Sequence, residues 1–184
     1  MNAVRVKILR ENALLPTYGS EQAAGADLYA CLESTVVIHP GETAFIPTGI
    51  SLEVPVGCAG LIYARSGLAC KRGLAPANKV GVVDSDYRGE IMVALFNHGE
   101  AAQTVVHGDR IAQMVITPVL TPAYCWAEDL EDTARGAGGF GATGAIRYTK
   151  PGSVPTPRFA LRGCSHILPA KRKKQPSAQR GGLF

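Results

Sequence analysis

Residues 90–117 read EIMVALFNHGEAAQTVVHGDRIAQMVIT and carry the clearest structural signal in the chain. Three runs within this stretch are rich in β-branched and other apolar residues: EIMVALFN, QTVVH and RIAQMVIT. The triplets Asn97-His98-Gly99 and His107-Gly108-Asp109 separate these runs and are typical of tight turns. Because short apolar runs between turn residues predict β-strands, we expect three consecutive strands here.

The same pattern continues toward the N-terminus. Residues 3–10 (AVRVKILR) alternate apolar and polar side chains with a period of two, which predicts a half-buried strand. Further apolar runs stand at 35–38, 43–46 and 59–64. Strands with turn signals every 8 to 12 residues or so favour a β-sandwich, jelly roll or barrel over alternating strands and helices. The stretches that could hold brief helices are 66–73 and 128–133.

Charge and composition divide the chain into a body and a tail. Of 184 residues, 46% are hydrophobic and 18% charged, which is typical of a globular domain. The first 132 residues hold all 15 acidic side chains and nine of the 19 Lys and Arg residues, a formal charge of −6. The rest hold ten basic side chains and no acidic one. We expect a β domain over 1–134, a glycine-rich segment over 135–144 and an extended or disordered basic tail over 145–184.

Composition also argues against several classes of protein. No run approaches the roughly 18 consecutive apolar residues that a membrane-spanning helix needs, so we expect an intracellular protein without membrane contact. The five cysteines are odd in number and form no C-x-x-C pair, which favours reduced thiols over disulfides or a zinc site. The four histidines likewise show no metal-ligand spacing.

Five short stretches combine glycine with charged or hydroxyl side chains: 23–30 (AAGADLYA), 64–69 (ARSGLA), 81–90 (GVVDSDYRGE), 109–114 (DRIAQM) and 135–144 (RGAGGFGATG). Their donors suit a triphosphate, which carries about four negative charges and needs cations, oriented N–H groups and usually magnesium. Arg65, Arg110, Arg135 and Gln113 are such donors, and the glycine-rich stretch can expose successive backbone N–H groups to an anion. By itself, that glycine-rich stretch would suit a nucleic acid equally well.

In this order and at these spacings, the five stretches resemble the five motifs of the trimeric dUTP diphosphatase (dUTPase) family. The resemblance covers residues 1–144. It implies an all-β, distorted jelly-roll barrel that assembles as a homotrimer with active sites shared between subunits. It also implies magnesium-assisted hydrolysis of dUTP to dUMP and pyrophosphate by attack of water at the α-phosphorus. That reaction limits uracil incorporation into DNA and supplies dUMP for thymidylate synthesis.

The resemblance assigns roles to residues of the third motif and the hairpin before it. Asp84 matches the base that activates the attacking water, whereas Asp86 matches a structural position. Tyr87 matches the tyrosine that packs against deoxyribose and leaves no room for a 2′-hydroxyl. Asn78 matches the side chain that hydrogen-bonds uracil, aided by the hairpin backbone around Gly81.

The other motifs match phosphate and metal positions. Asp27 resembles the carboxylate that holds Mg²⁺ through water. Phosphate contacts are implied for Arg65, Ser66, Gly67 and Gln113. Arg110 fits two roles equally, a phosphate donor or a structural partner of a buried carboxylate. The last motif places Phe140 over the uracil ring and places three residues around the γ-phosphate: Arg135, Gly141 and Thr143. Ala142 stands where the family commonly has serine, so one hydroxyl donor is missing.

Two rival functions stay open at this point. A dCTP deaminase shares the fold and the Arg65-Ser66 pair, but the uracil hairpin, Tyr87 and the glycine-rich motif favour the diphosphatase. A non-catalytic nucleotide-binding or signalling protein is the second rival, and the presence of Asp84 argues against it.

The tail carries a basic run that the motifs do not explain. Its residues are Lys171, Arg172, Lys173 and Lys174. The run resembles a nuclear localisation signal, which predicts a nuclear import receptor as partner and the nucleus as location. The alternatives are a nucleic-acid-binding patch and a merely solvated run of charge, with the cytoplasm as location.

Overall fold

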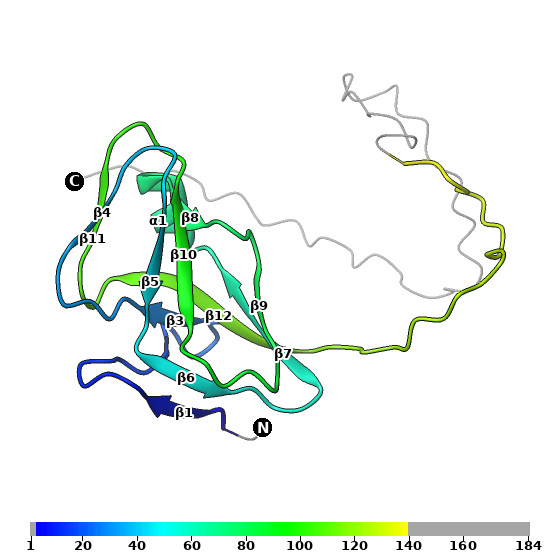
Figure 1. Ribbon diagram of the computed structural model, residues 1–184, viewed down its shortest axis with the longest axis horizontal. Helices are drawn as coiled ribbons and strands as arrows, with labels where there is room; N and C mark the ends of the chain where they lie inside the picture. The colour runs from blue at the N-terminus through cyan, green and yellow to red at the C-terminus, as the bar shows by residue number, and fades with distance from the viewer. Residues whose placement is uncertain (1–2, 140–184) are drawn as a thin grey trace, which may run out of the picture. The chain divides into compact units, whose positions relative to one another are not determined.

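The computed structural model describes residues 3–139, which fold mainly as short β-strands with one short helix (Figure 1). The chain divides into two compact units, Met1–Trp126 and Ala127–Phe184. The first unit contains every described strand and the helix, so the expectation of an all-β fold is confirmed. The described part of the second unit, residues 127–139, has neither.

The largest sheet has five strands, in the order β2-β3-β12-β7-β9. Their bounds are β2 Thr17–Tyr18, β3 Ala26–Tyr29, β12 Arg110–Pro118, β7 Cys58–Tyr63 and β9 Gly81–Val83. The central strand β12 pairs antiparallel with both β3 and β7, and its Gln113 lies opposite Asp27 on one side and Tyr63 on the other. This register brings three of the five motifs to one region of the sheet.

A second sheet of three antiparallel strands has the order β5-β10-β8, and Figure 1 shows its strands side by side. Two further antiparallel pairs are β1-β6 and β11-β4. The bounds are β5 Thr43–Pro47, β10 Met92–Asn97, β8 Leu74–Pro76, β1 Arg5–Ile8, β6 Ile50–Glu53, β11 Gln103–Val105 and β4 Val36–Ile38.

One hydrophobic core joins these sheets. Alternation on β10 turns Val93 and Leu95 inward, where both are buried, and leaves Met92 exposed. Leu28 on β3 and Ile111 on β12 are buried in the same cluster. Burial of each such side chain contributes about 1.5–3 kcal/mol to folding, so these strands are held by the core as well as by their ladders.

The helix α1 spans Ser66–Arg72 and begins directly after the β7 segment. It ends at Gly73, whose φ of 67° is left-handed and whose N–H donates to the Ala69 carbonyl. This helix was expected at 66–73 and is confirmed. None of the helical residues that the structure describes forms a segment long and apolar enough to cross a membrane.

The sequence also allowed a brief helix at 128–133, and this prediction is wrong. These residues are fully described, and none of them is helical. Four of the six are acidic and all are exposed, so the segment has no apolar face to pack. A helix of so few residues is unstable in water without such packing.

Candidate active site

A surface hollow of about 250 Å³ brings together four predicted phosphate-site residues and the predicted metal-site carboxylate. Asp27 comes from β3, Gln113 from β12, Arg65 from the short connection after β7, and Ser66 and Gly67 from the start of α1. Arg110, at the start of β12, also lines the hollow. Two cations, one carboxylate, an amide and a hydroxyl therefore face one space.

Asp27 organises the charge of this hollow. Its side chain is only 9% exposed, and the Arg65 Nε donates to its Oδ1 at 2.7 Å. The Arg110 Nη1 lies 3.4 Å from the other oxygen, Oδ2. A buried carboxylate would be costly without such partners, and in return it fixes two guanidinium groups at the edge of the hollow. The structure thus shows Arg110 in the role of a structural partner of a buried carboxylate, while its phosphate role stays a prediction.

Gln113 connects the central strand to the loop that carries Arg65. Its Nε2 donates to the Ala64 carbonyl at 2.9 Å. On the opposite side, Gly25 approaches so closely that a Cβ there would lie 2.8 Å from Gln113 Oε1. Glycine at 25 is therefore needed for the amide to occupy this position.

A second hollow, of about 270 Å³, adjoins the first and shares Arg65, Gly67 and Arg110 with it. It is also lined by Arg72, whose Nε donates to Gln103 Oε1 at 3.0 Å. The two hollows thus continue one another around the start of α1, and both are lined by arginine.

The predicted uracil-binding residues Asn78 and Gly81 lie on the connection between β8 and β9. This connection is not the expected hairpin, because β8 pairs with β10 and β9 pairs with β7 in a different sheet. Its turn holds Lys79 at a φ of 60°. A Cβ at Gly81 would lie 3.0 Å from the Asn78 Nδ2, so the amide lies directly over the glycine backbone. The Asn78 amide thus packs against Gly81, which is buried at the start of β9.

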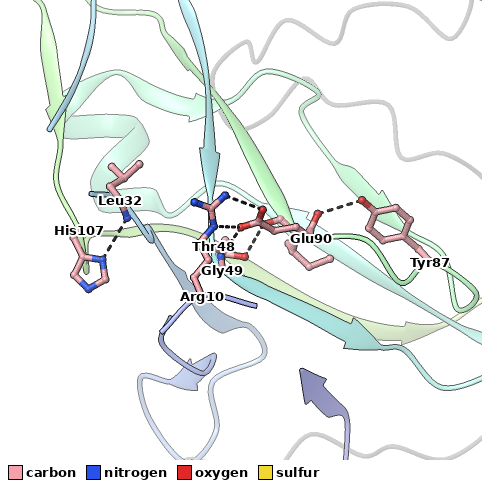
Figure 2. A network of polar contacts seen from close by, with 8 residues as sticks. Arg10, Leu32, Thr48, Gly49, Tyr87, Glu90 and His107 are labelled. Atoms are coloured by element: carbon pink, nitrogen blue, oxygen red, sulfur yellow. Dashed lines mark hydrogen bonds and ion pairs between the residues drawn. The ribbon is translucent and has the colours of Figure 1, made fainter. Parts of the chain in front are cut away.

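Asp84 and Tyr87 share the turn that follows β9. The Tyr87 N–H donates to the Asp84 carbonyl at 3.2 Å, which closes the turn. The Asp84 side chain is exposed, and so is able to meet a substrate. The Tyr87 side chain is 46% exposed, and its Oη donates to the Glu90 carbonyl at 3.2 Å (Figure 2).

Glu90 and Arg10 form an ion pair at the end of this turn that sequence reasoning missed. The Arg10 Nε and Nη2 donate to the two Glu90 carboxylate oxygens at 3.0 and 3.1 Å. The Gly49 N–H donates to the same carboxylate at 2.9 Å (Figure 2). The hydrogen bond from Arg10 lowers the pKa of Glu90, which partial burial alone would raise. No local pattern could have revealed a pair whose members lie 80 residues apart.

Asn78, Asp84 and Tyr87 line neither hollow. Because β9 runs antiparallel to β7, the turn after β9 lies towards the start of β7, whereas Arg65 follows its end. Arg135 is exposed and its Nε donates to the Gly138 carbonyl at 2.8 Å. The rest of the predicted lid lies outside the described residues, namely Phe140, Gly141 and Thr143, and so does the tail 145–184.

Comparison with known proteins gives one consistent result. The family model dUTPase matches residues 11–144. The deoxyuridine 5′-triphosphate nucleotidohydrolase of Desulfitobacterium hafniense (strain DSM 10664 / DCB-2) is 50% identical over 149 residues, covering 78% of this chain and 99% of the relative. That of Syntrophotalea carbinolica is 48% identical over 141 residues, covering 77% and 96%.

Solved structures agree with this result. The dUTPase of Staphylococcus bacteriophage 80alpha with dUpNHpp has a TM-score of 0.72 and 29% identity, covering 79% of this chain and all of that chain. The dUTPase of phage phi11 of S. aureus, with its species-specific insert, has a TM-score of 0.65 and 27% identity, covering 72% and 100%. The chain belongs to the dUTPase family, with its distorted jelly-roll fold. It is a dUTP diphosphatase, which hydrolyses dUTP to dUMP and pyrophosphate.

Proposed function

We propose that this hydrolysis uses the turn after β9 for water activation and the arginine-lined hollow for the phosphates. Asp84 accepts a proton from a water molecule as that water attacks the α-phosphorus. The bond from the α-phosphorus to the bridging oxygen breaks, and pyrophosphate leaves. Two observations support this role: Asp84 is exposed, and the hydrogen bond from the Tyr87 N–H to the Asp84 carbonyl fixes the backbone of the turn that carries it.

In this proposal the hollow holds the triphosphate chain. Arg65 supplies positive charge from a position fixed by Asp27, and Ser66 and Gly67 supply a hydroxyl and backbone N–H groups at the start of α1. The amide of Gln113 adds a further polar contact. Donors held in advance bind developing negative charge without reorganising, which is why the fixed guanidinium favours the leaving pyrophosphate.

We propose that the connection between β8 and β9, with Asn78, selects the base and that the turn after β9, with Tyr87, selects the sugar. Asn78 and the backbone at Gly81 would pair with uracil, and cytosine would leave these polar groups unpaired. The Tyr87 ring would pack against deoxyribose and exclude a ribose 2′-hydroxyl. These two selections together would separate dUTP from dCTP and from UTP.

Magnesium fits this site only as an ion that arrives with the phosphates. The residues described here contain no group of three or more His, Cys, Asp or Glu side chains able to hold a metal. Asp27 offers one carboxylate at the hollow, and each of its oxygens already accepts from a guanidinium. We propose that Asp27 contacts the ion through water, where bound Mg²⁺ would neutralise phosphate charge. Magnesium dependence is general in the family, and a dUTPase variant of phage phi11 has a structural Mg(II) ion.

The glycine-rich segment would close the site over bound substrate. Arg135, Gly141 and Thr143 would surround the γ-phosphate, and Phe140 would cover the uracil. A closed segment excludes water other than the attacking molecule and completes the set of donors. Ala142 leaves this segment with one hydroxyl fewer than is common in the family.

We further propose that three copies of the chain assemble and share their sites. The separation of the hollow from the turn within one chain supports this proposal, because a neighbouring subunit would bring its turn to the hollow. In a symmetric trimer the three interfaces are equivalent, so one such pairing of hollow and turn would produce three identical sites.

The basic run in the tail is proposed to bind either nucleic acid or a nuclear import receptor. Lys171, Arg172, Lys173 and Lys174 supply the charge for either partner. The relatives named above are bacterial, and this favours nucleic acid.

One observation carries the proposal. The turn after β9 holds both Asp84 and Tyr87, and it follows the connection that carries Asn78. The test is a pyrophosphate-release assay with dUTP, UTP, dCTP and dTTP. We expect release from dUTP alone at an appreciable rate. Ammonia release from dCTP would support a deaminase instead, and nucleotide binding without any product would support a non-catalytic protein.

A further inference from the structure

The turn that carries Asp84 and Tyr87 is held by residues that lie outside the five motifs. Arg10 forms a bidentate ion pair with Glu90, and the Gly49 N–H donates to the same carboxylate. Gly49 has a left-handed φ of 72°. Arg10 also lies outside the residues that the family model matches, 11–144. We call the Arg10, Gly49 and Glu90 contacts the brace.

The brace acts on a short piece of backbone that is tied on both sides. The Thr48 Oγ1 donates to the Ile91 carbonyl at 2.6 Å, and the Ile91 N–H donates to the Ile50 carbonyl at 2.8 Å. On the other side of Glu90, the buried Ser51 donates its Oγ proton to the Arg88 carbonyl at 2.7 Å. Residues 88–91 are therefore fixed to the segment 48–51, and the Glu90 side chain is the charged member of this attachment.

Tyr87 depends on the same backbone for its orientation. Its side chain is 46% exposed, so core packing does not set its rotamer. Its Oη donates to the Glu90 carbonyl, and its phenol ring covers Gly89 so closely that a Cβ there would overlap the ring. The ring thus lies on residues 89–90, and any shift of these residues moves the ring.

We infer that Arg10 is a positioning residue for Tyr87 and thereby sets the discrimination between deoxyribose and ribose. The inference rests on the proposed role of Tyr87 in sugar selection. Bidentate arginine–carboxylate pairs fix geometry as well as adding energy, so Arg10 holds Glu90 in one orientation. To exclude a single 2′-hydroxyl, the Tyr87 ring must be held in position to within a fraction of the width of that hydroxyl. Loss of the Arg10–Glu90 ion pair should therefore lower the selectivity for dUTP over UTP in a protein that still folds.

The first experiment measures selectivity in Arg10→Gln. The measured quantity is kcat/KM for dUTP divided by kcat/KM for UTP, because this ratio is independent of the fraction of protein that is folded. We expect the ratio to fall roughly tenfold, as sub-ångström to ångström displacements at an active site commonly cost one to two orders of magnitude. Where UTP turnover is too slow to measure, the inhibition constant of UTP divided by the KM for dUTP compares the binding of the two nucleotides instead. Lys7→Gln is the control, because Lys7 carries the same charge on the same segment and makes no ion pair within residues 3–139.

The second experiment tests the coupling. Arg10→Lys keeps the charge but loses the bidentate geometry, so its ratio should lie between those of the wild type and Arg10→Gln. Tyr87→Phe removes the hydroxyl that donates to the Glu90 carbonyl. Arg10→Gln should therefore change the selectivity ratio less in the Tyr87→Phe background than in the wild type. An unchanged ratio in Arg10→Gln, or full additivity with Tyr87→Phe, would overturn the inference. A wild-type protein that releases no pyrophosphate from dUTP would instead overturn the proposed function.

Discussion

Asp84 is the residue on which the proposed chemistry depends most directly. Asp84→Asn removes the proton acceptor, so turnover of dUTP should fall by roughly two to four orders of magnitude, while binding of dUMP changes little. Asp86→Asn is the matched control, because it makes the same change on the same exposed turn two residues away. Steady-state pyrophosphate release and a dUMP titration measure the two effects. Near-normal turnover of a folded Asp84→Asn protein would remove Asp84 from the role of base.

Glu90 makes a pH-dependent contribution to stability. Its pKa in the folded protein is lowered, chiefly by the hydrogen bond from Arg10, from an ordinary value near 4.5. A lowered pKa means that the stabilisation is fully present above the unfolded pKa and is lost as pH falls through the folded one. At pH 7, Glu90→Gln should lower the free energy of unfolding by about 1 kcal/mol, since Arg10 is 43% exposed and solvent screens the pair.

Thermal unfolding of the wild type and Glu90→Gln across pH tests this contribution. The difference in Tm should shrink as the pH falls below the ordinary value near 4.5 and towards the lower pKa of the folded protein, where the wild-type carboxylate becomes protonated. The glutamine amide oxygen still accepts from the Gly49 N–H, so the comparison isolates the charge. A constant difference from pH 7 to acid would mean that Glu90 stabilises the protein by packing rather than by charge.

Single residues differed in how far the sequence could predict them. The motifs singled out Asp27, Arg65 and Gln113 as site residues, and the structure brings all three to one hollow, while their roles stay predictions. For Arg110, pairing with a buried carboxylate was one of two alternatives, and only the strand register shows that this carboxylate is Asp27. Arg10 and Gly49 were not predicted because their partner is distant in sequence and neither residue type signals a contact by itself.

Elements with a strong alternating or β-branched pattern were predicted well. The runs that correspond to β1, β4, β5, β7, β10, β11 and β12 are all confirmed as strands. The missed strands were β2, β3, β6, β8 and β9, which are two to four residues long. Such strands are set by pairing with neighbours rather than by their own pattern: β3 contains Asp27, and β8 ends in Pro76.

The glycine-rich segment is the element whose removal should separate binding from catalysis. Truncation after Thr133 removes Arg135 and the remainder of the proposed lid, but leaves the hydrophobic core intact. We expect a folded protein that binds dUMP and hydrolyses dUTP poorly, because the γ-phosphate contacts are gone. Circular dichroism, dUMP titration and pyrophosphate release measure the three properties. Full activity of the truncated chain would show that residues 135–144 act only as a linker.

At the scale of the whole molecule, the basic tail should be separable from hydrolysis. Residues 145–184 lie outside all five motifs and carry nine Lys and Arg residues without an acidic one. Deleting them should leave the steady-state rate with dUTP nearly unchanged. If the tail binds nucleic acid, the intact protein should bind it in a manner that weakens steeply with salt, and the deletion should abolish most of that binding.

A second tail variant tests the alternative partner. Neutralising Lys171, Arg172, Lys173 and Lys174 should disperse nuclear accumulation of the protein expressed in eukaryotic cells, if the run binds an import receptor. Unchanged localisation would remove the import receptor from consideration. Loss of hydrolysis on deleting only 145–184 would contradict the separation of tail and catalyst. It would mean that the tail stabilises the closed glycine-rich segment or the trimer.

Asp84 lines neither hollow of its own chain, and the proposed sharing of sites between subunits has a genetic consequence. Two null alleles, Asp84→Asn in the turn and Arg65→Gln in the hollow, should complement each other when both are expressed in one cell. In randomly mixed trimers, about a quarter of the sites would combine an intact hollow with an intact turn from a neighbour, so about a quarter of wild-type activity should return. Two alleles of the same cluster should not complement. Purified variants, mixed after dissociation and reassembled, give the same test in vitro, and no recovery would mean that each chain acts on its own.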